Sequence, residues 1–243
     1  MLFGFKKKKK SGQENIQLAE NQFCSVVEVD AEDVTTEYHF LANSDCYCLL
    51  YRDGQFLGMP RPNGGKIYPF STDPTREGSR GDLKSFTRAK LVYLSKDFNL
   101  KVNWGTSSKF MLEDPQTHKA YYVGARGVFY VNIDTNDAAR KADRFYRKCL
   151  SQGNASMFDT EKLRDFLREA FIMHIGAKIQ EYITQSGRSL DNYVGLMPSE
   201  ILKISQELCP TMKDIFGEYG LTIVQKSSMG SILSGIEVEE ATR

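Results

Sequence analysis

The feature that most constrains the fold of this chain is a change in the spacing of its apolar residues near residue 134. Before that point, from Phe23 to about Tyr130, short β-branched or aromatic runs alternate with polar turns, which predicts a succession of strands. After it, apolar residues recur every three or four positions, the period of an α-helix. Strands first and helices afterwards predict an α+β fold, with an antiparallel β-sheet followed by packed helices.

Turn signals divide the strand-rich half into short strands. Asp53-Gly54 stands between two apolar runs and predicts a hairpin of strands over 46–51 and 56–59. The segment 71–84 has almost no apolar residue and predicts an exposed loop. Further strands are expected over 23–29, 66–70, 90–94, 100–104, 109–112, 120–123, 127–133 and 221–224.

Three helices are expected in the second half. The first covers about 138–149, and the second covers 160–183 with a broad apolar stripe. His174 lies on that stripe, so we expect it to be packed and hydrogen-bonded. Pro198 suits the start of the third helix, which Pro210 is expected to kink or divide. The long stripe is a candidate assembly surface, although a stripe that simply covers the sheet is favoured.

We expect one domain with a tail at each end. Residues 1–15 are a flexible basic tail, 16–226 form the domain, and 227–243 form a short frayed tail. The length of 243 residues is enough to bury a core. Thirty-two basic and 31 acidic residues give a net charge of +1, so no overall field favours a nucleic-acid partner.

Composition also limits the class of protein. No stretch approaches the roughly 20 apolar residues of a membrane span, and the apolar residues at the N-terminus precede the charges, unlike a secretory signal. The five cysteines include no CxxC pair, so neither a disulfide framework nor a zinc ribbon is indicated. We expect a cytoplasmic protein with reduced thiols, no metal and no cofactor.

The residues suited to catalysis form no familiar arrangement. The three histidines lack the spacing of a metal site. Cys46 and Cys48 point to the same face of a strand, because side chains alternate, and core packing is favoured over the start of a metal site. We therefore expect no enzyme. The alternative is a small-molecule or hydrolytic site assembled from dispersed residues such as Cys46, Cys48 and His118.

The N-terminal tip carries the strongest local concentration of positive charge, five consecutive lysines after three apolar residues. Its members are Leu2, Phe3, Phe5, Lys6, Lys7, Lys8, Lys9 and Lys10. The apolar side chains can insert into the headgroup boundary while each lysine contributes about 1 kcal/mol near anionic lipid. This predicts reversible, salt-sensitive membrane binding. A solubilising tail is the alternative, and nucleic acid is disfavoured because no aromatic platform accompanies the lysines.

Five short segments also follow one another in a recognisable order. They are residues 51–55 (Tyr-Arg-Asp-Gly-Gln), 100–106 (Leu-Lys-Val-Asn-Trp-Gly-Thr), 125–131 (Ala-Arg-Gly-Val-Phe-Tyr-Val), 158–161 (Phe-Asp-Thr-Glu) and 218–221 (Glu-Tyr-Gly-Leu). Over about residues 16–235, this order resembles the SPFH (band 7) superfamily of stomatin, prohibitin and flotillin. It is most similar to the bacterial cytoplasmic branch often labelled virion-core-protein-like.

The resemblance implies an SPFH-type fold and a noncatalytic scaffold that lies peripherally at the cytoplasmic face of the membrane. It also implies self-assembly into homo-oligomers and recruitment of protein partners, whose identity the sequence leaves open. The family-motif residues are Trp104, Gly105, Thr106, Arg126, Gly127, Tyr219 and Gly220. The alternative is a soluble cytosolic adaptor, with a phage-related one among the options, that binds proteins and never contacts lipid.

Overall fold

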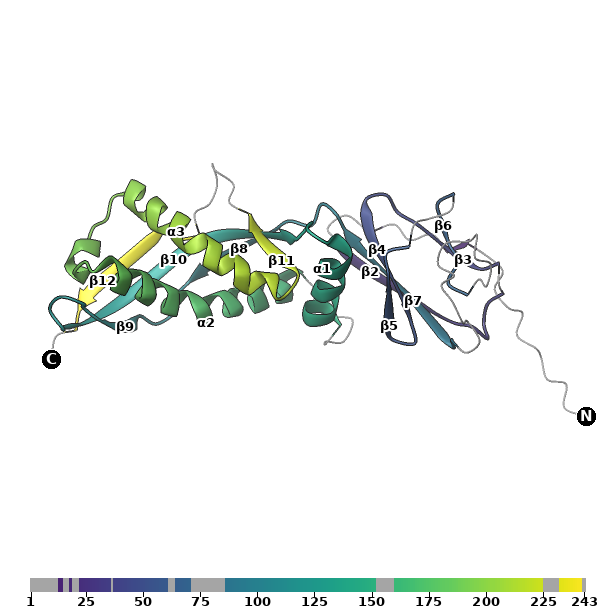
Figure 1. The fold of residues 1–243 in the computed structure, drawn as a ribbon, viewed down its shortest axis with the longest axis horizontal. Helices are drawn as coiled ribbons and strands as arrows, with labels where there is room; N and C mark the ends of the chain where they lie inside the picture. Colours follow the sequence, from purple (N-terminus) through teal and green to yellow (C-terminus); the bar gives the residue numbers. More distant parts are fainter. Residues whose placement is uncertain are drawn as a thin grey trace, which may run out of the picture. The chain divides into compact units, whose positions relative to one another are not determined.

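The chain folds into two compact units, each built from two segments (Figure 1). The computed structural model describes residues 13–14, 18, 22–35, 37–60, 64–70, 86–151, 160–224 and 232–241. Unit 1 comprises Met1–Phe98 and Thr135–Arg147, and unit 2 comprises Asn99–Asp134 and Lys148–Arg243. Both units contain antiparallel sheet and the described residues include three α-helices, so the class is α+β. The single domain expected over 16–226 is instead divided in two.

Unit 1 is built on a four-stranded antiparallel sheet of order β2-β7-β4-β5. Its strands are β2 (Cys24–Asp30), β7 (Arg88–Ser95), β4 (Cys46–Arg52) and β5 (Gln55–Gly58). A smaller sheet joins β1 (Gln13–Glu14), β3 (His39–Leu41) and β6 (Lys66–Ile67). The predicted hairpin between β4 and β5 is confirmed: Asp53 and Gly54 have φ of 45° and 80°, the positive values that a tight hairpin turn requires.

Strand β4 is buried on both faces, which explains its nearly continuous apolar sequence. Cys46, Cys48 and Leu50 belong to the core cluster that includes Phe40 of β3. On the other face, the hydroxyl of Tyr51 donates a hydrogen bond of 2.7 Å to Asp143. Asp143 lies in α1 (Ala138–Phe145), which continues as a π-helical turn over Tyr146–Leu150, so the predicted first helix is confirmed.

Unit 2 is organised around one long strand, β10 (Ala120–Ile133). On one side it pairs with β8 (Leu100–Gly105) and β9 (Phe110–Glu113), and on the other with β11 (Leu221–Val224) and β12 (Gly235–Glu240). Two expectations are wrong here. Strands 120–123 and 127–133 are one strand, because β12 pairs with β10 across the interval between them. Residues 235–240, expected in a frayed tail, form β12.

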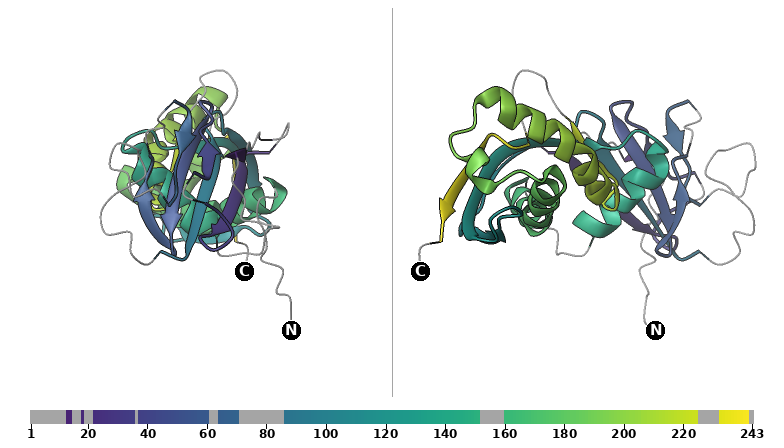
Figure 2. Two further views of the ribbon diagram at one scale, coloured as in Figure 1. Left: turned by 90° about the vertical axis from the view of Figure 1, so that its right-hand side faces the viewer. Right: turned by 60° about the vertical axis from the view of Figure 1, so that its left-hand side comes forward.

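Two helices cover the concave side of the unit 2 sheet (Figure 2). They are α2 (Thr160–Ser186) and α3 (Pro198–Gly217), joined through the 3-10 turn η3 (Leu190–Tyr193). Phe171 of α2 packs on Trp104 and Phe129 of the sheet, with ring centroids 4.8 and 4.4 Å apart. The apolar stripe of α2 therefore covers its own sheet. Helix α3 passes through Pro210 without dividing.

Helix α2 also protects the free edge of strand β8. The guanidinium groups of Arg164 and Arg168 donate hydrogen bonds of 3.0 Å to the backbone carbonyls of Lys101 and Asn103, which occupies acceptors that an edge strand would otherwise leave open. His174, expected to be packed, is exposed, because it lies beside the line of buried residues. No helix among the described residues combines the length and apolar character needed to cross a membrane.

Candidate functional site

The residues predicted to bind membrane lie outside the described part of the chain. They are Leu2, Phe3, Phe5 and Lys6 to Lys10. Membrane binding by the tip therefore stays a prediction. The family-motif residues and the candidate thiols are among the described residues.

All seven family-motif residues belong to unit 2, and five of them lie together where strands β8 and β10 pair. Strand β8 runs antiparallel to β10 so that Trp104 stands opposite Gly127 and Gly105 opposite Arg126. The hydroxyl of Thr106 accepts a hydrogen bond of 3.1 Å from the backbone N–H of Ala125. Two segments separated by about 20 residues thus form one neighbourhood of two paired strands.

Trp104, Gly127 and Ile232 form a close contact that we call the Trp104 joint. The indole N–H of Trp104 donates a buried hydrogen bond of 2.7 Å to the carbonyl of Ile232. A Cβ at position 127 would lie 2.1 Å from that carbonyl oxygen and 2.8 Å from the indole nitrogen, closer than atoms can approach. Glycine at 127 therefore lets the segment leading into β12 pass over the sheet and be held by the tryptophan.

Tyr219 and Gly220 serve a different connection, between α3 and β11. Gly220 has φ of 78°, which favours glycine, and its carbonyl accepts a hydrogen bond of 3.1 Å from Asp134 at the end of β10. The ring of Tyr219 meets that of Phe166 edge-on at 5.6 Å. These two motif residues therefore shape a turn.

The other face of the sheet beside the Trp104 joint carries a shallow polar hollow of about 340 Å³. Gly105, Gly124 and Gly235 contribute to it, and Arg126 lies across Gly235, where an added Cβ would be 3.1 Å from the arginine Nε. Lys109 crosses Gly124 to pair with Glu239 at 2.8 Å. Glu237 also lines the hollow, so cationic and anionic groups are balanced there.

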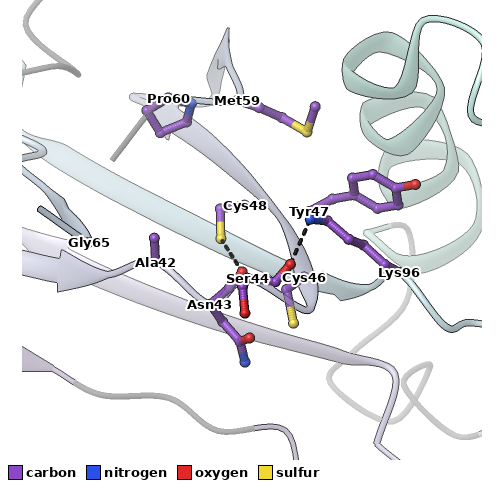
Figure 3. Close-up of a pocket in the computed structure, with 10 residues that line it drawn as sticks. All are labelled: Ala42, Asn43, Ser44, Cys46, Tyr47, Cys48, Met59, Pro60, Gly65 and Lys96. Carbon is purple, nitrogen blue, oxygen red and sulfur yellow. Dashed lines mark hydrogen bonds between the residues drawn. The ribbon is translucent and has the colours of Figure 1, made fainter. Parts of the chain in front are cut away.

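Unit 1 contains a larger cavity, of about 450 Å³, beside Cys46 and Cys48 (Figure 3). It lies between the start of β4, the end of β5 and the turn before β6. The side chains and backbone that line it belong to Ala42, Asn43, Ser44, Cys46, Tyr47, Cys48, Met59, Pro60, Gly65 and Lys96. The thiol of Cys48 donates a hydrogen bond of 3.9 Å to the carbonyl of Asn43.

Both thiols at this cavity are held in the protonated form. Burial raises the pKa of Cys46 to about 11, with further increases from neighbouring Cys48 and Asp45 and an opposing effect of Lys96. Burial likewise raises the pKa of the Cys48 thiol, against the lowering effects of its hydrogen bond and of Lys96. Because the thiolate is the nucleophile and metal ligand, these cysteines are poorly suited to either task as they stand.

His118, the third member of the alternative dispersed site, belongs to unit 2, whereas both thiols belong to unit 1. It lies in the β9–β10 turn with φ of 56°, and its Nδ1 is 2.7 Å from the carboxylate of Glu113. Its side chain is 78% exposed. Across the described ranges, no three His, Cys, Asp or Glu side chains are grouped to hold a metal ion.

Asp114 is a buried carboxylate that sequence reasoning missed. It accepts hydrogen bonds from the backbone N–H groups of Gln116, Thr117 and Leu190 and from the hydroxyl of Ser189. Burial alone would raise the pKa of Asp114, but these four donors outweigh it and hold the pKa well below its ordinary value. The sequence Asp-Pro-Gln-Thr at 114–117 is typical of a turn. It does not indicate that Asp114 also accepts hydrogen bonds from residues 189 and 190.

Comparisons with protein-family models, with curated proteins and with solved structures find no match. The resemblance to the SPFH superfamily thus depends on the motif residues described above.

Proposed function

We propose that this chain is a noncatalytic scaffold of the SPFH type, which associates peripherally with the cytoplasmic face of a membrane, self-assembles and recruits partner proteins. The observation that carries the proposal is the Trp104 joint. Residues of the motif that are distant in sequence pair across β8 and β10. Trp104 binds the chain leading into β12, and Gly127 leaves the space that this chain occupies. Such mutual dependence supports reading these residues as one fold signature, not as chance matches.

The membrane part of the proposal depends on the N-terminal tip. Three apolar side chains and five lysines supply a few kcal/mol on an anionic surface, since each lysine contributes about 1 kcal/mol. Such binding is weak for one copy. Self-assembly would present several tips to the same surface, and linked weak contacts raise the effective affinity steeply.

Flotation with vesicles tests the membrane part. Full-length protein should float with phosphatidylglycerol vesicles at low salt, and should remain at the bottom at high salt or with phosphatidylcholine alone. Changing Lys6, Lys8 and Lys10 to Gln should weaken binding about a hundredfold, at about 1 kcal/mol per lysine. A matched control changes three exposed lysines of the helices to Gln. These are Lys162, Lys203 and Lys213.

Two results would contradict the membrane part: protein that stays at the bottom at low salt, or a tip variant that floats like wild type. Either would favour the soluble adaptor. Self-assembly has its own test, light scattering of the full chain in solution. A mass of 27.6 kDa at every concentration would mean a monomer and would remove the assembly part of the proposal.

A further inference from the structure

The unit 1 cavity beside Cys46 and Cys48 is mostly apolar in its walls and has the size of a small-ligand site. Its volume of about 450 Å³ lies within the roughly 300–1,000 Å³ that such sites occupy. Apolar surface comes from Ala42, Met59 and Pro60, together with the two uncharged thiols (Figure 3). A cavity of this kind accepts an alkyl chain, because each buried CH₂ stabilises the complex by about 0.8 kcal/mol.

Several polar groups in the cavity wall are already engaged within the protein. The side-chain oxygen of Asn43 accepts a hydrogen bond of 2.9 Å from the backbone N–H of Asp45. The backbone carbonyl of Asn43 accepts one of 3.2 Å from the N–H of Cys46. The hydroxyl of Ser44 donates to the carboxylate of Asp45 at 3.2 Å. These groups therefore give a ligand little to bind.

Lys96 is the cationic group of the cavity lining. Its ammonium group donates one hydrogen bond of 2.6 Å to the carbonyl of Ser44 and lies 5.9 Å from the centre of the Tyr47 ring. An ammonium group has three N–H donors. Among the described residues no carboxylate forms an ion pair with Lys96, so donors remain at the rim of the cavity for an anionic group.

We propose that this cavity binds a medium-chain fatty acid, with the alkyl chain against Ala42, Met59 and Cys48 and the carboxylate on the ammonium of Lys96. A single cation beside an apolar wall suits a monoanion that carries an apolar tail, because the charge-assisted hydrogen bond fixes one end and burial holds the other. The ligand site is independent of the scaffold function proposed above.

Calorimetric titration of the full chain with decanoate, below its micelle concentration, tests the site. Decanoate should bind in a one-to-one ratio, butyrate should not bind because it lacks the tail, and decanol should bind more weakly because it lacks the charge. Lys96→Met should weaken decanoate binding by about ten- to a hundredfold, the effect of losing a hydrogen bond to a charged group. Lys66→Met, which removes a charge from β6 outside the cavity lining, is the matched control and should bind like wild type.

Alkylation gives a second readout that does not depend on heat. Decanoate should slow the modification of Cys46 and Cys48 by iodoacetamide at alkaline pH, where a larger fraction of these thiols is ionised. The modification is measured by mass spectrometry, and Cys149 and Cys209 of unit 2 serve as internal standards. The proposal is overturned if wild-type protein shows neither heat nor thiol protection at millimolar decanoate, if Lys96→Met binds as tightly as Lys66→Met, or if butyrate binds equally well.

Discussion

Gly127→Ala tests the Trp104 joint most directly. The added methyl group would lie 2.1 Å from the carbonyl oxygen of Ile232 and 2.7 Å from its carbonyl carbon, so the backbone leading into β12 must move. Overpacking of this kind costs about 1–3 kcal/mol. Moving that carbonyl also breaks the 2.7 Å hydrogen bond from Trp104, at about 0.5–1.5 kcal/mol. We expect unit 2 to lose about 1.5–4.5 kcal/mol of unfolding free energy.

Gly105→Ala is the matched control, because it lies on the neighbouring strand within the same motif. A Cβ there would meet its nearest neighbours at 3.6 and 3.8 Å, ordinary van der Waals distances, so its stability should change little. Urea unfolding followed by tryptophan fluorescence is the assay, since Trp104 is the single tryptophan of the chain and lies in the joint itself. If both variants have the same unfolding midpoint as wild type, the steric argument at Gly127 is refuted.

Three further predictions concern stability. Asp114→Asn should destabilise unit 2 by about 1.5–3 kcal/mol at pH 7. Because the folded pKa of Asp114 is lowered, wild type should lose this contribution as pH falls below about 4, and urea midpoints of wild type and variant should converge in acid. Deleting 235–243 should speed exchange of the Tyr122 and Gly124 amides, which face β12, more than that of the Ala125 amide, which is bonded to Thr106; unchanged exchange at 122 and 124 would contradict the pairing. Tyr51→Phe removes the hydrogen bond to Asp143 and should lower the melting temperature measured by circular dichroism, whereas Tyr122→Phe, at an exposed position, should not.

Local signals accounted for most of the secondary structure. The Asp53-Gly54 hairpin and the start of α3 at Pro198 each depend on backbone preferences of the residues themselves, which sequence reports directly. The α+β class followed from the change of apolar spacing near residue 134. Pro210 does not divide α3, because packing of the apolar face of the helix can outweigh the loss of one backbone hydrogen bond.

Long-range pairing accounted for the errors. Ile236 and Val238 alternate with Glu237 and Glu239, the period of a half-buried strand, yet the acidic residues suggested a solvated tail. Those glutamates suit an edge strand, where charge discourages pairing with other chains. The division into two units could not be predicted either. Residues 135–147 belong to unit 1, and the local composition does not change where the chain passes from one unit to the other.

The motif residues show that a sequence motif can consist of residues that shape the fold and need not include residues that bind or react with a ligand. Gly127 and Trp104 are constrained by a contact with Ile232, and Gly220 by a turn with positive φ. Each would be needed in any protein that folds this way, whatever it binds. The group proposed here to hold a ligand lies elsewhere: Lys96 beside an apolar cavity is in unit 1, and no motif residue lines that cavity. A variant that abolishes decanoate binding should therefore leave the unfolding of unit 2 unchanged, and Gly127→Ala should leave decanoate binding unchanged. If either substitution changed both decanoate binding and the unfolding of unit 2, the motif residues and the ligand site would not be independent of each other.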